Sequence, residues 1–211
     1  MDRTQTIQYV TDKMKNQEPF AYLKMGDDCM FCMKGQQGAN AEQHPYSSEL
    51  GIHLREAHRY MLTQPNVIVT EWGDDNFDSL LLHEDSYLTE DLKEFYRTLK
   101  HDPRKKYYFA QERMRPAAEF FNMEFVPVPF PDSYSHFKQV KKEIQKIMDN
   151  NIIILFSCGM LSKVMVYECW KACPYMTAID LGSAFDPLFV GSTRSHDPDQ
   201  HIRVKEYFKD L

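Results

Sequence analysis

The chain has 211 residues, of which 43% are hydrophobic and 27% are charged, as in soluble globular proteins. Its net charge of −6 and the lack of a dense lysine and arginine block argue against binding to a long nucleic acid. No apolar run approaches the ~20 residues that cross a bilayer, so we expect no transmembrane segment. The absence of a secretory signal pattern and the odd number of cysteines, 5, predict a cytoplasmic protein.

Apolar periodicity predicts alternating helices and strands along the whole chain. The first half is predicted to contain helix 4–16, strand 19–25, a loop at 26–28, a helix from Ser47, strand 66–72, a strand or helix at 80–83, helix 89–100 and strand 106–110. The second half is predicted to contain a short helix ending near 121, an extended segment 125–129, helix 134–148, strand 151–156, helix 160–173, strand 176–180 and an amphipathic piece 202–208. This alternation indicates an α/β protein with a mostly parallel central sheet flanked by helices, and we expect residues 1–211 to form a single domain.

The strongest local pattern is the apolar, β-branched run at 151–156, which is typical of a strand buried on both faces. A turn of small residues, the helix 160–173 and the strand 176–180 follow, and together they predict a βαβ unit with parallel strands. Ligands of such sheets collect at the carboxyl ends of the strands, where a helix N-terminus offers free N–H groups. We therefore expect the turn 157–163 and the loop 180–186 to border one site for an anionic ligand.

Within this turn, Ser157, Gly159, Ser162 and Lys163 are candidates for holding a phosphate or pyrophosphate. The turn lacks the spacing of a P-loop and of Gly-x-Gly-x-x-Gly, so a dinucleotide site is poorly supported. It does offer two hydroxyls, backbone amides and a lysine about one turn into the helix. The alternative is that a serine only caps the helix and that Lys163 points into water.

Acidic residues follow other predicted strands. Asp27 and Asp28 come directly after strand 19–25, where they could bind a divalent metal ion through hard oxygen ligands or could be solvated turn residues. Asp180 ends a later strand and could accept hydrogen bonds from ribose or sugar hydroxyls, or could cap a turn.

Four further residues are candidates for the same crevice. Ser183 and Asp186 lie in the loop after strand 176–180, and Glu112 follows strand 106–110. Arg194 is a candidate phosphate partner, because the fork of a guanidinium matches phosphate oxygens.

The order and spacing of several segments resemble glycosyltransferases of the GT-D fold and their relatives. The resemblance rests on residues 25–33, 46–51, 157–170, 178–187 and 192–194. In that family a strand ends in Gly-Asp-Gly-Glu, the Asp-x-Glu motif. Asp27 falls on the first acid of this motif, whereas Asp28 stands in place of its second glycine and Cys29 in place of its glutamate.

The resemblance implies a Rossmann-like domain that transfers a sugar from a nucleotide-sugar donor, commonly a UDP-sugar, to an acceptor hydroxyl on a glycan. A divalent cation, Mn²⁺ or Mg²⁺, would be held by Asp27 and Asp28 against the donor diphosphate. Residues of the 157–163 turn would contact the same diphosphate, and residues of the 180–186 loop would line the nucleotide or the sugar.

A transfer that inverts the anomeric carbon needs a general base, for which Glu112 is the first candidate and Asp186 the second. Two other functions stay open. An S-adenosylmethionine-dependent methyltransferase uses the same type of sheet, but it usually needs a glycine-rich turn that residues 26–28 match poorly. A non-catalytic α/β module that binds a partner protein is the third possibility.

Overall fold

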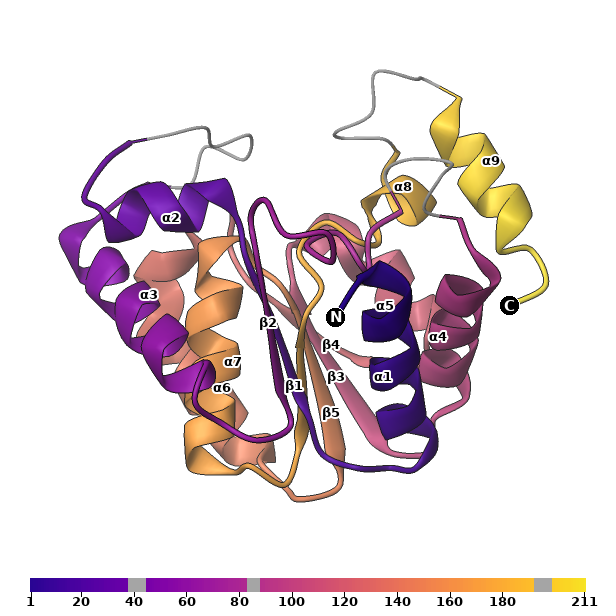
Figure 1. Cartoon of the computed structure of the whole chain (residues 1–211), viewed down its shortest axis with the longest axis horizontal. Helices are drawn as coiled ribbons and strands as arrows, with labels where there is room; N and C mark the ends of the chain where they lie inside the picture. Colours follow the sequence, from indigo (N-terminus) through magenta and orange to yellow (C-terminus); the bar gives the residue numbers. More distant parts are fainter. Residues whose placement is uncertain (38–44, 83–87, 192–198) are drawn as a thin grey trace.

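The computed structural model of the protein describes residues 1–37, 45–82, 88–191 and 199–211. A six-stranded sheet runs through this described part, with helices against each face (Figure 1). The strands are β1 (Ala21–Met25), β2 (Val67–Glu71), β3 (Lys105–Ala110), β4 (Glu124–Pro127), β5 (Ile152–Ser157) and β6 (Thr177–Asp180). The α/β class predicted from the sequence is confirmed.

The strand order is β2-β1-β6-β5-β3-β4, and every neighbouring pair is parallel. β5 and β6 pair directly, with Ile154 opposite Ala178, so the predicted βαβ unit is confirmed. β5 is buried along its whole length, as its unbroken apolar run predicts. β4 ends in Pro127 and lies at one edge of the sheet, where proline is tolerated.

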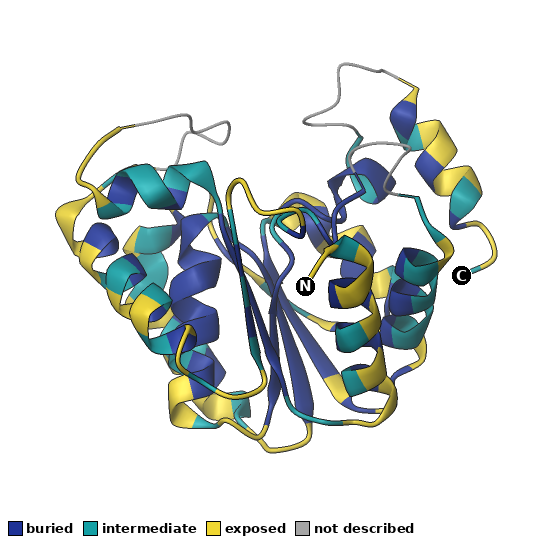
Figure 2. Cartoon of the chain, in the orientation of Figure 1, coloured by how far each residue is buried: buried dark blue, intermediate teal, exposed yellow. Residues whose placement is uncertain are grey.

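Alternate residues of β5 point to opposite helix layers. Ile154 and Phe156 belong to the core beneath one layer, whereas Ile153 and Leu155 belong to the core beneath the other. The first layer contains α2 (Asp27–Met33), α3 (Ser48–Met61), α6 (Phe137–Ile147) and α7 (Met160–Ala172). The second layer contains α1 (Arg3–Lys15), α4 (Glu90–His101), α5 (Arg115–Phe120), α8 (Asp186–Phe189) and α9 (Gln200–Tyr207). The strands between them are largely buried (Figure 2).

Capping side chains set the starts of α3 and α4. Ser47 Oγ accepts a hydrogen bond from the N–H of Leu50 at 3.1 Å, as the sequence predicts, and Thr89 Oγ1 accepts one from Leu92 at 3.4 Å. In contrast, α7 begins after Gly159 and has no side-chain cap. Among the helices that the structure describes, none is long and apolar enough to cross a membrane.

Two local predictions were wrong. The segment 26–28, predicted as a loop, starts α2, because the buried thiols of Cys29 and Cys32 give this short helix an apolar side. Of the segment 80–83, predicted as strand or helix, residues 80–82 form a turn and an irregular stretch with buried leucines, and residue 83 lies outside the described residues. The hydroxyl of Tyr96 donates a hydrogen bond to the carbonyl of Leu80, which provides a partner for this irregular backbone.

Candidate functional site

The candidate site lies at the carboxyl edge of the sheet, which is the upper edge in Figure 1. Here β5 continues into α7 on one face, whereas its neighbour β6 continues toward α8 on the other face. β1 ends beside β6 and leads directly into α2. Parallel α/β sheets bind ligands where neighbouring connections leave to opposite faces, so this edge is the expected place for a site.

A buried ion pair joins α7 to the end of β6. Lys163 Nζ lies 3.0 Å from Asp180 Oδ2, and the two side chains are 7% and 0% exposed. Asp180 also accepts the backbone N–H groups of Lys24 at 3.3 Å and Gly182 at 3.1 Å, and so ties β6 to β1. Burial disfavours the ammonium form, but the charge and hydrogen bond of Asp180, together with the nearby Cys29 and Asp28, outweigh it and raise the pKa of Lys163 above 10.5. Contact of either side chain with a nucleotide-sugar donor stays a prediction.

α2 brings the predicted acidic motif to this ion pair. Asp28 lies close enough to Lys163 for its charge to help raise the pKa of the lysine, so the structure brings these two elements together. Asp27 Oδ1 accepts the N–H of Asp28 at 2.9 Å, and Asp28 Oδ1 accepts the N–H of Cys29 at 2.7 Å. The half-buried carboxylates therefore sit in the first turn of α2, held by backbone contacts.

The start of α7 is a locked turn. Gly159 has φ 59° and ψ −136°, a conformation that strains any residue with a Cβ atom. Ser162 Oγ accepts the N–H of Cys158 at 2.8 Å, and Lys163 Nζ donates to the carbonyl of Gly159 at 3.2 Å. Ser162 thus closes the turn that precedes the helix, whereas Lys163, which the alternative expects to point into water, is buried against Asp180. The following N–H groups of α7 point along the helix axis toward the edge, where they favour a negative charge.

On the other side of β5, three buried hydroxyl groups lie close to the same edge. Ser157 Oγ, Ser183 Oγ and Tyr108 Oη make no hydrogen bond of good geometry in the part of the chain that the structure describes, although the hydroxyls of Ser157 and Tyr108 lie near each other. Burying a hydroxyl group without a partner is costly, so such groups usually mark the place of a ligand or water molecule. Ser157 and Ser183 were predicted to contact the nucleotide-sugar donor, and these orphan hydroxyls are compatible with that role.

The two candidate general bases have different surroundings. Asp186 is buried and lies 3.6 Å from the guanidinium of Arg113. Glu112 is exposed, and its ion pair with Arg115 lowers the pKa of its carboxyl group. Arg194, the predicted phosphate partner, lies outside the described residues.

Sequence reasoning missed Lys24, Phe77 and Asp78, which lie beside the site. Lys24 Nζ is 2.7 Å from Asp78 Oδ1 and 4.3 Å from the centre of the Phe77 ring. A lysine inside the apolar strand 19–25 was the available signal, because a buried lysine requires an acidic partner. Tyr108 was also missed, since an aromatic residue in a strand is indistinguishable from core packing.

The acids of α2 fit a metal ion only in part. Within the ranges that the structure covers, no group of three or more His, Cys, Asp or Glu side chains could hold a metal ion. Cys29, which stands where the motif has glutamate, is a fully buried thiol and offers no hard oxygen ligand. Asp27 and Asp28 each use one oxygen on the backbone, which leaves a second oxygen on each. Mg²⁺ commonly takes one or two carboxylates together with substrate phosphates, so these residues fit a cation held jointly with a diphosphate.

Comparisons with solved structures give the fold a name. A highly conserved domain of unknown function 1792, described as having a distinct glycosyltransferase fold, aligns with a TM-score of 0.62 at 15% identity over 89% of this chain and 81% of its own. A selenomethionine-substituted structure of that domain gives a TM-score of 0.60 with the same identity and coverage. No family model and no curated protein matches the sequence. This chain therefore has the glycosyltransferase fold described for that domain, as the sequence resemblance implies.

Proposed function

We propose that the protein is a glycosyltransferase that moves a sugar from a UDP-sugar to a hydroxyl group of a glycan acceptor. The observation that carries this proposal is the meeting of the acidic start of α2 with the Lys163–Asp180 pair, at the carboxyl edge of a glycosyltransferase fold. Glycosyl transfer requires that a diphosphate leaving group be held and stabilised while an acceptor hydroxyl is positioned. The groups at this edge are of the types that such a reaction uses.

The start of α7 would bind the diphosphate. Its uncapped first turn offers backbone N–H groups and the positive end of a 13-residue helix. The side chain of Ser157 adds a buried hydroxyl without a described partner. Lys163 would support the diphosphate site from below the turn. Its pair with Asp180 holds α7 against β6 and places a positive charge under the turn.

Asp27 and Asp28 would hold Mn²⁺ or Mg²⁺ through the oxygen atoms that do not contact the backbone. When bound, the cation would offset negative charge on the diphosphate. With Cys29 in place of a third acid, affinity for the cation depends on these two carboxylates and on the diphosphate itself. We therefore expect weak cation binding without nucleotide.

Burial supports Asp186 over Glu112 as the general base, which reverses the order taken from the sequence. The ion pair with Arg115 makes Glu112 less basic and holds it in solvent. Asp186 is buried at the edge beside the orphan hydroxyl of Ser183. Asp186→Asn should accordingly reduce transfer far more than Glu112→Gln does.

Ligand-induced stabilisation tests the proposal. A UDP-sugar at 100 times its Kd should stabilise the fold by about 2.7 kcal/mol, measured as a shift in the thermal midpoint with and without Mn²⁺. Stabilisation by S-adenosylmethionine instead would favour a methyltransferase, and stabilisation by neither would favour a binding module.

Replacement of the first acid tests its part in the reaction. Asp27→Ala should lower the rate of sugar transfer by at least about 100-fold, because a charge-stabilising group is lost at the diphosphate. Asp149→Ala, which removes an exposed acid just before β5 at the opposite edge, is the matched control and should transfer at the wild-type rate. An unchanged rate in Asp27→Ala would remove the acidic motif from the mechanism.

A further inference from the structure

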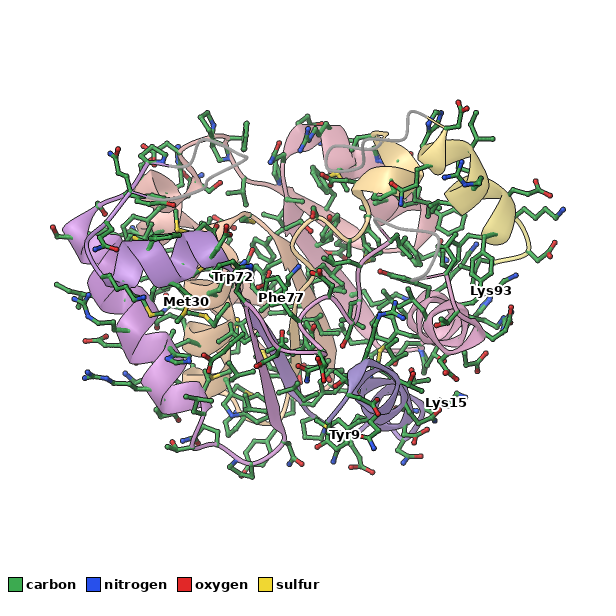
Figure 3. All side chains as sticks on the ribbon, turned by 45° about the horizontal axis from the view of Figure 1, so that its top comes forward. Tyr9, Lys15, Met30, Trp72, Phe77 and Lys93 are labelled. Atoms are coloured by element: carbon green, nitrogen blue, oxygen red, sulfur yellow. The ribbon has the colours of Figure 1, made fainter. Side chains whose placement is uncertain are left out.

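A cavity of about 300 Å³ lies at the carboxyl end of the edge strand β2, outside the residues assigned above to the nucleotide-sugar donor. It is lined by Arg3, Trp72, Gly73, Asp74, Asp75, Phe77 and Asp78. Figure 3 shows Trp72 and Phe77 close to α2, which carries the acidic motif in its first turn. The cavity therefore combines two aromatic rings with several carboxylates.

Short contacts connect this cavity to the proposed donor site. Asp78 lines the cavity and pairs with Lys24, whose backbone N–H donates to Asp180. The ring of Phe77 lies so close to the start of α2 that a Cβ atom on Gly26 would be 3.9 Å from it. A ligand in the cavity would therefore adjoin a sugar held at the acidic motif.

The cavity has the surface chemistry that a neutral sugar needs. Trp72 is 60% exposed, although large aromatic side chains are usually buried. A pyranose ring offers a face of C–H groups that stacks on an indole, and its rim of hydroxyls donates hydrogen bonds to carboxylates. Asp74 already accepts the N–H of Glu71 at 3.0 Å, which fixes its side chain at the cavity wall.

The charge of the cavity favours a neutral ligand over a cation. Three lining residues are acids and one is an arginine, and Lys24 pairs with Asp78, so the net charge is only −1. A site for a cationic ligand would leave more of its acids without a basic partner.

We propose that this cavity is the acceptor subsite, in which a sugar of the glycan stacks on Trp72 and its hydroxyls donate to Asp74 and Asp75. The assignment of the bound sugar as an acceptor rests on the proposed transferase function. The cavity would hold the acceptor between Arg3 of α1 and the residues that follow β2, next to the end of β1, where the N–H of Trp72 donates to the carbonyl of Met25 at 2.9 Å.

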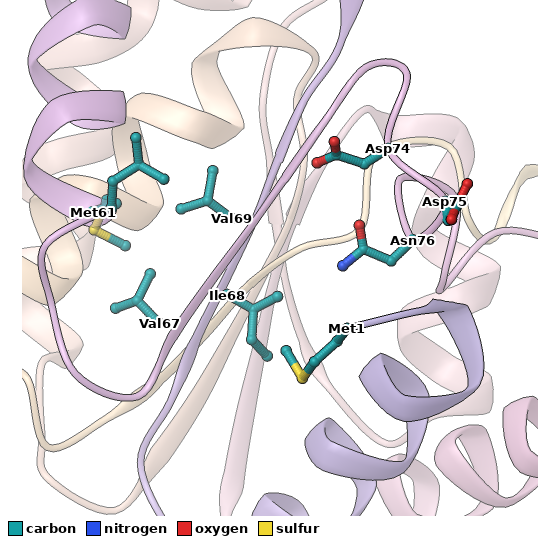
Figure 4. Close-up of a pocket in the computed structure, with 9 residues that line it drawn as sticks. Met1, Met61, Val67, Ile68, Val69, Asp74, Asp75 and Asn76 are labelled. Carbon is teal, nitrogen blue, oxygen red and sulfur yellow. The ribbon is translucent and has the colours of Figure 1, made fainter.

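A second hollow gives room for a longer glycan. It has a volume of about 490 Å³ and lies along β2, at the open edge of the sheet. It shares Asp74 and Asp75 with the first cavity (Figure 4). Val67, Val69 and Met61 supply its apolar wall. We therefore expect acceptors of two or more sugars to bind more tightly than monosaccharides.

A glycan array probed with the full chain tests the subsite. Wild type should bind a set of glycans, and Trp72→Ala should bind the same set at least about tenfold more weakly, because the stacking surface is lost. Tyr175→Ala removes another aromatic side chain, 65% exposed in a loop at the opposite edge, and should bind as wild type. The thermal midpoint of each variant without ligand shows that it is folded.

Tryptophan fluorescence gives a second readout on the wild-type protein. Of the two tryptophans, Trp170 is 2% exposed, so a blue shift on adding an array hit reports on Trp72. No glycan binding by wild type, or equal binding by Trp72→Ala, would overturn the subsite. The UDP-sugar thermal shift of wild type is scored separately, so failure of the transferase proposal is distinguishable from failure of the subsite.

Discussion

The buried polar side chains at the amino edge of the sheet have hydrogen-bond partners, whereas several at the carboxyl edge have none among the described residues. At the amino edge, the guanidinium of Arg104 donates to both oxygens of Asp102 at 3.0 and 2.7 Å and to the hydroxyl of Thr177 at 2.9 Å. Lys106 Nζ donates to three backbone carbonyls near the end of α4, at distances of 3.0 to 3.2 Å. These buried side chains all have side-chain or backbone partners, and their network links the end of α4 to the starts of β3 and β6.

At the carboxyl edge the network is incomplete. Lys163 and Asp180 form a closed pair, but the hydroxyls of Ser157, Ser183 and Tyr108 have no partner among the described residues. A fold can carry such groups when a ligand completes their hydrogen bonds. Burial of a polar group therefore does not mark a ligand site by itself, whereas a cluster of buried hydroxyls without described partners at the carboxyl edge indicates one.

Removing the hydrogen bonds of Arg104 at the amino edge should have the largest effect on stability. Arg104→Met leaves the carboxylate of Asp102, whose side chain is 1% exposed, without its partner. We expect the free energy of unfolding to fall by about 3–5 kcal/mol, measured by urea denaturation. A loss below about 1 kcal/mol would show that the hydrogen bonds of Arg104 do not stabilise the amino edge.

Removing the lysine of the other pair should give a loss that depends on pH. In wild type the pKa of Lys163 is raised above 10.5, so the stability that this lysine contributes is fully present below pH 10.5 and is lost only as the pH rises through the folded-state value. Lys163→Met should lose about 3 kcal/mol at pH 7, because Asp180 remains buried and unpaired.

The loss in Lys163→Met should shrink as the pH falls toward about 5, since an unpaired buried carboxylate favours its protonated form. Urea denaturation of wild type and variant at pH 5, 7 and 9 measures this trend. A loss that is the same at all three values would contradict the buried pairing.

The sequence predicts the frame of the molecule because burial leaves a direct pattern in it. The apolar run at 151–156 indicates a strand buried on both faces, and the prolines at 127 and 129 indicate an edge. Ser157 and Ser183 could be selected because they follow predicted strands. Their lack of hydrogen-bond partners depends on neighbouring strands and is invisible in a single sequence.

The residues that were misassigned or missed also depend on contacts and burial that appear only in the folded chain. Asp27 and Asp28 resemble loop residues until the burial of Cys29 shows that a helix begins there. Trp72 is the last residue of the predicted strand 66–72 and resembles an ordinary strand residue in the sequence, because its exposure is a property of the folded chain. Pairings between distant segments, such as Lys24 with Asp78, likewise require the sheet order.

Removing an orphan hydroxyl should have a small effect on stability and a larger effect on ligand binding. Ser157→Ala deletes a buried hydroxyl without a partner, so the free energy of unfolding should change by less than about 1 kcal/mol or should rise. Affinity for a UDP-sugar should fall about tenfold if one hydrogen bond is lost, measured by calorimetric titration. A destabilisation of several kcal/mol with unchanged affinity would show that Ser157 has a structural role, like the hydrogen-bonded side chains of the amino edge, and does not bind the ligand.

The smallest effect concerns the thiols. Burial raises the pKa of Cys29, at the carboxyl edge, well above 9.0, whereas Cys173, near the amino edge, is only half-buried. In the native protein at pH 8, Cys173 should react with a thiol reagent before the other four cysteines do. Rapid reaction of Cys29 would show that the carboxyl edge is open to solvent beneath α2.

In the proposed reaction, the carboxyl edge holds the diphosphate of a nucleotide sugar between α2 and α7. A crystal structure of the protein with UDP and Mn²⁺ tests it most directly. We expect diphosphate oxygens within hydrogen-bond distance of the first N–H groups of α7, with the cation between them and the carboxylates of Asp27 and Asp28. UDP bound away from this edge, or bound here without contact to α7, would contradict it.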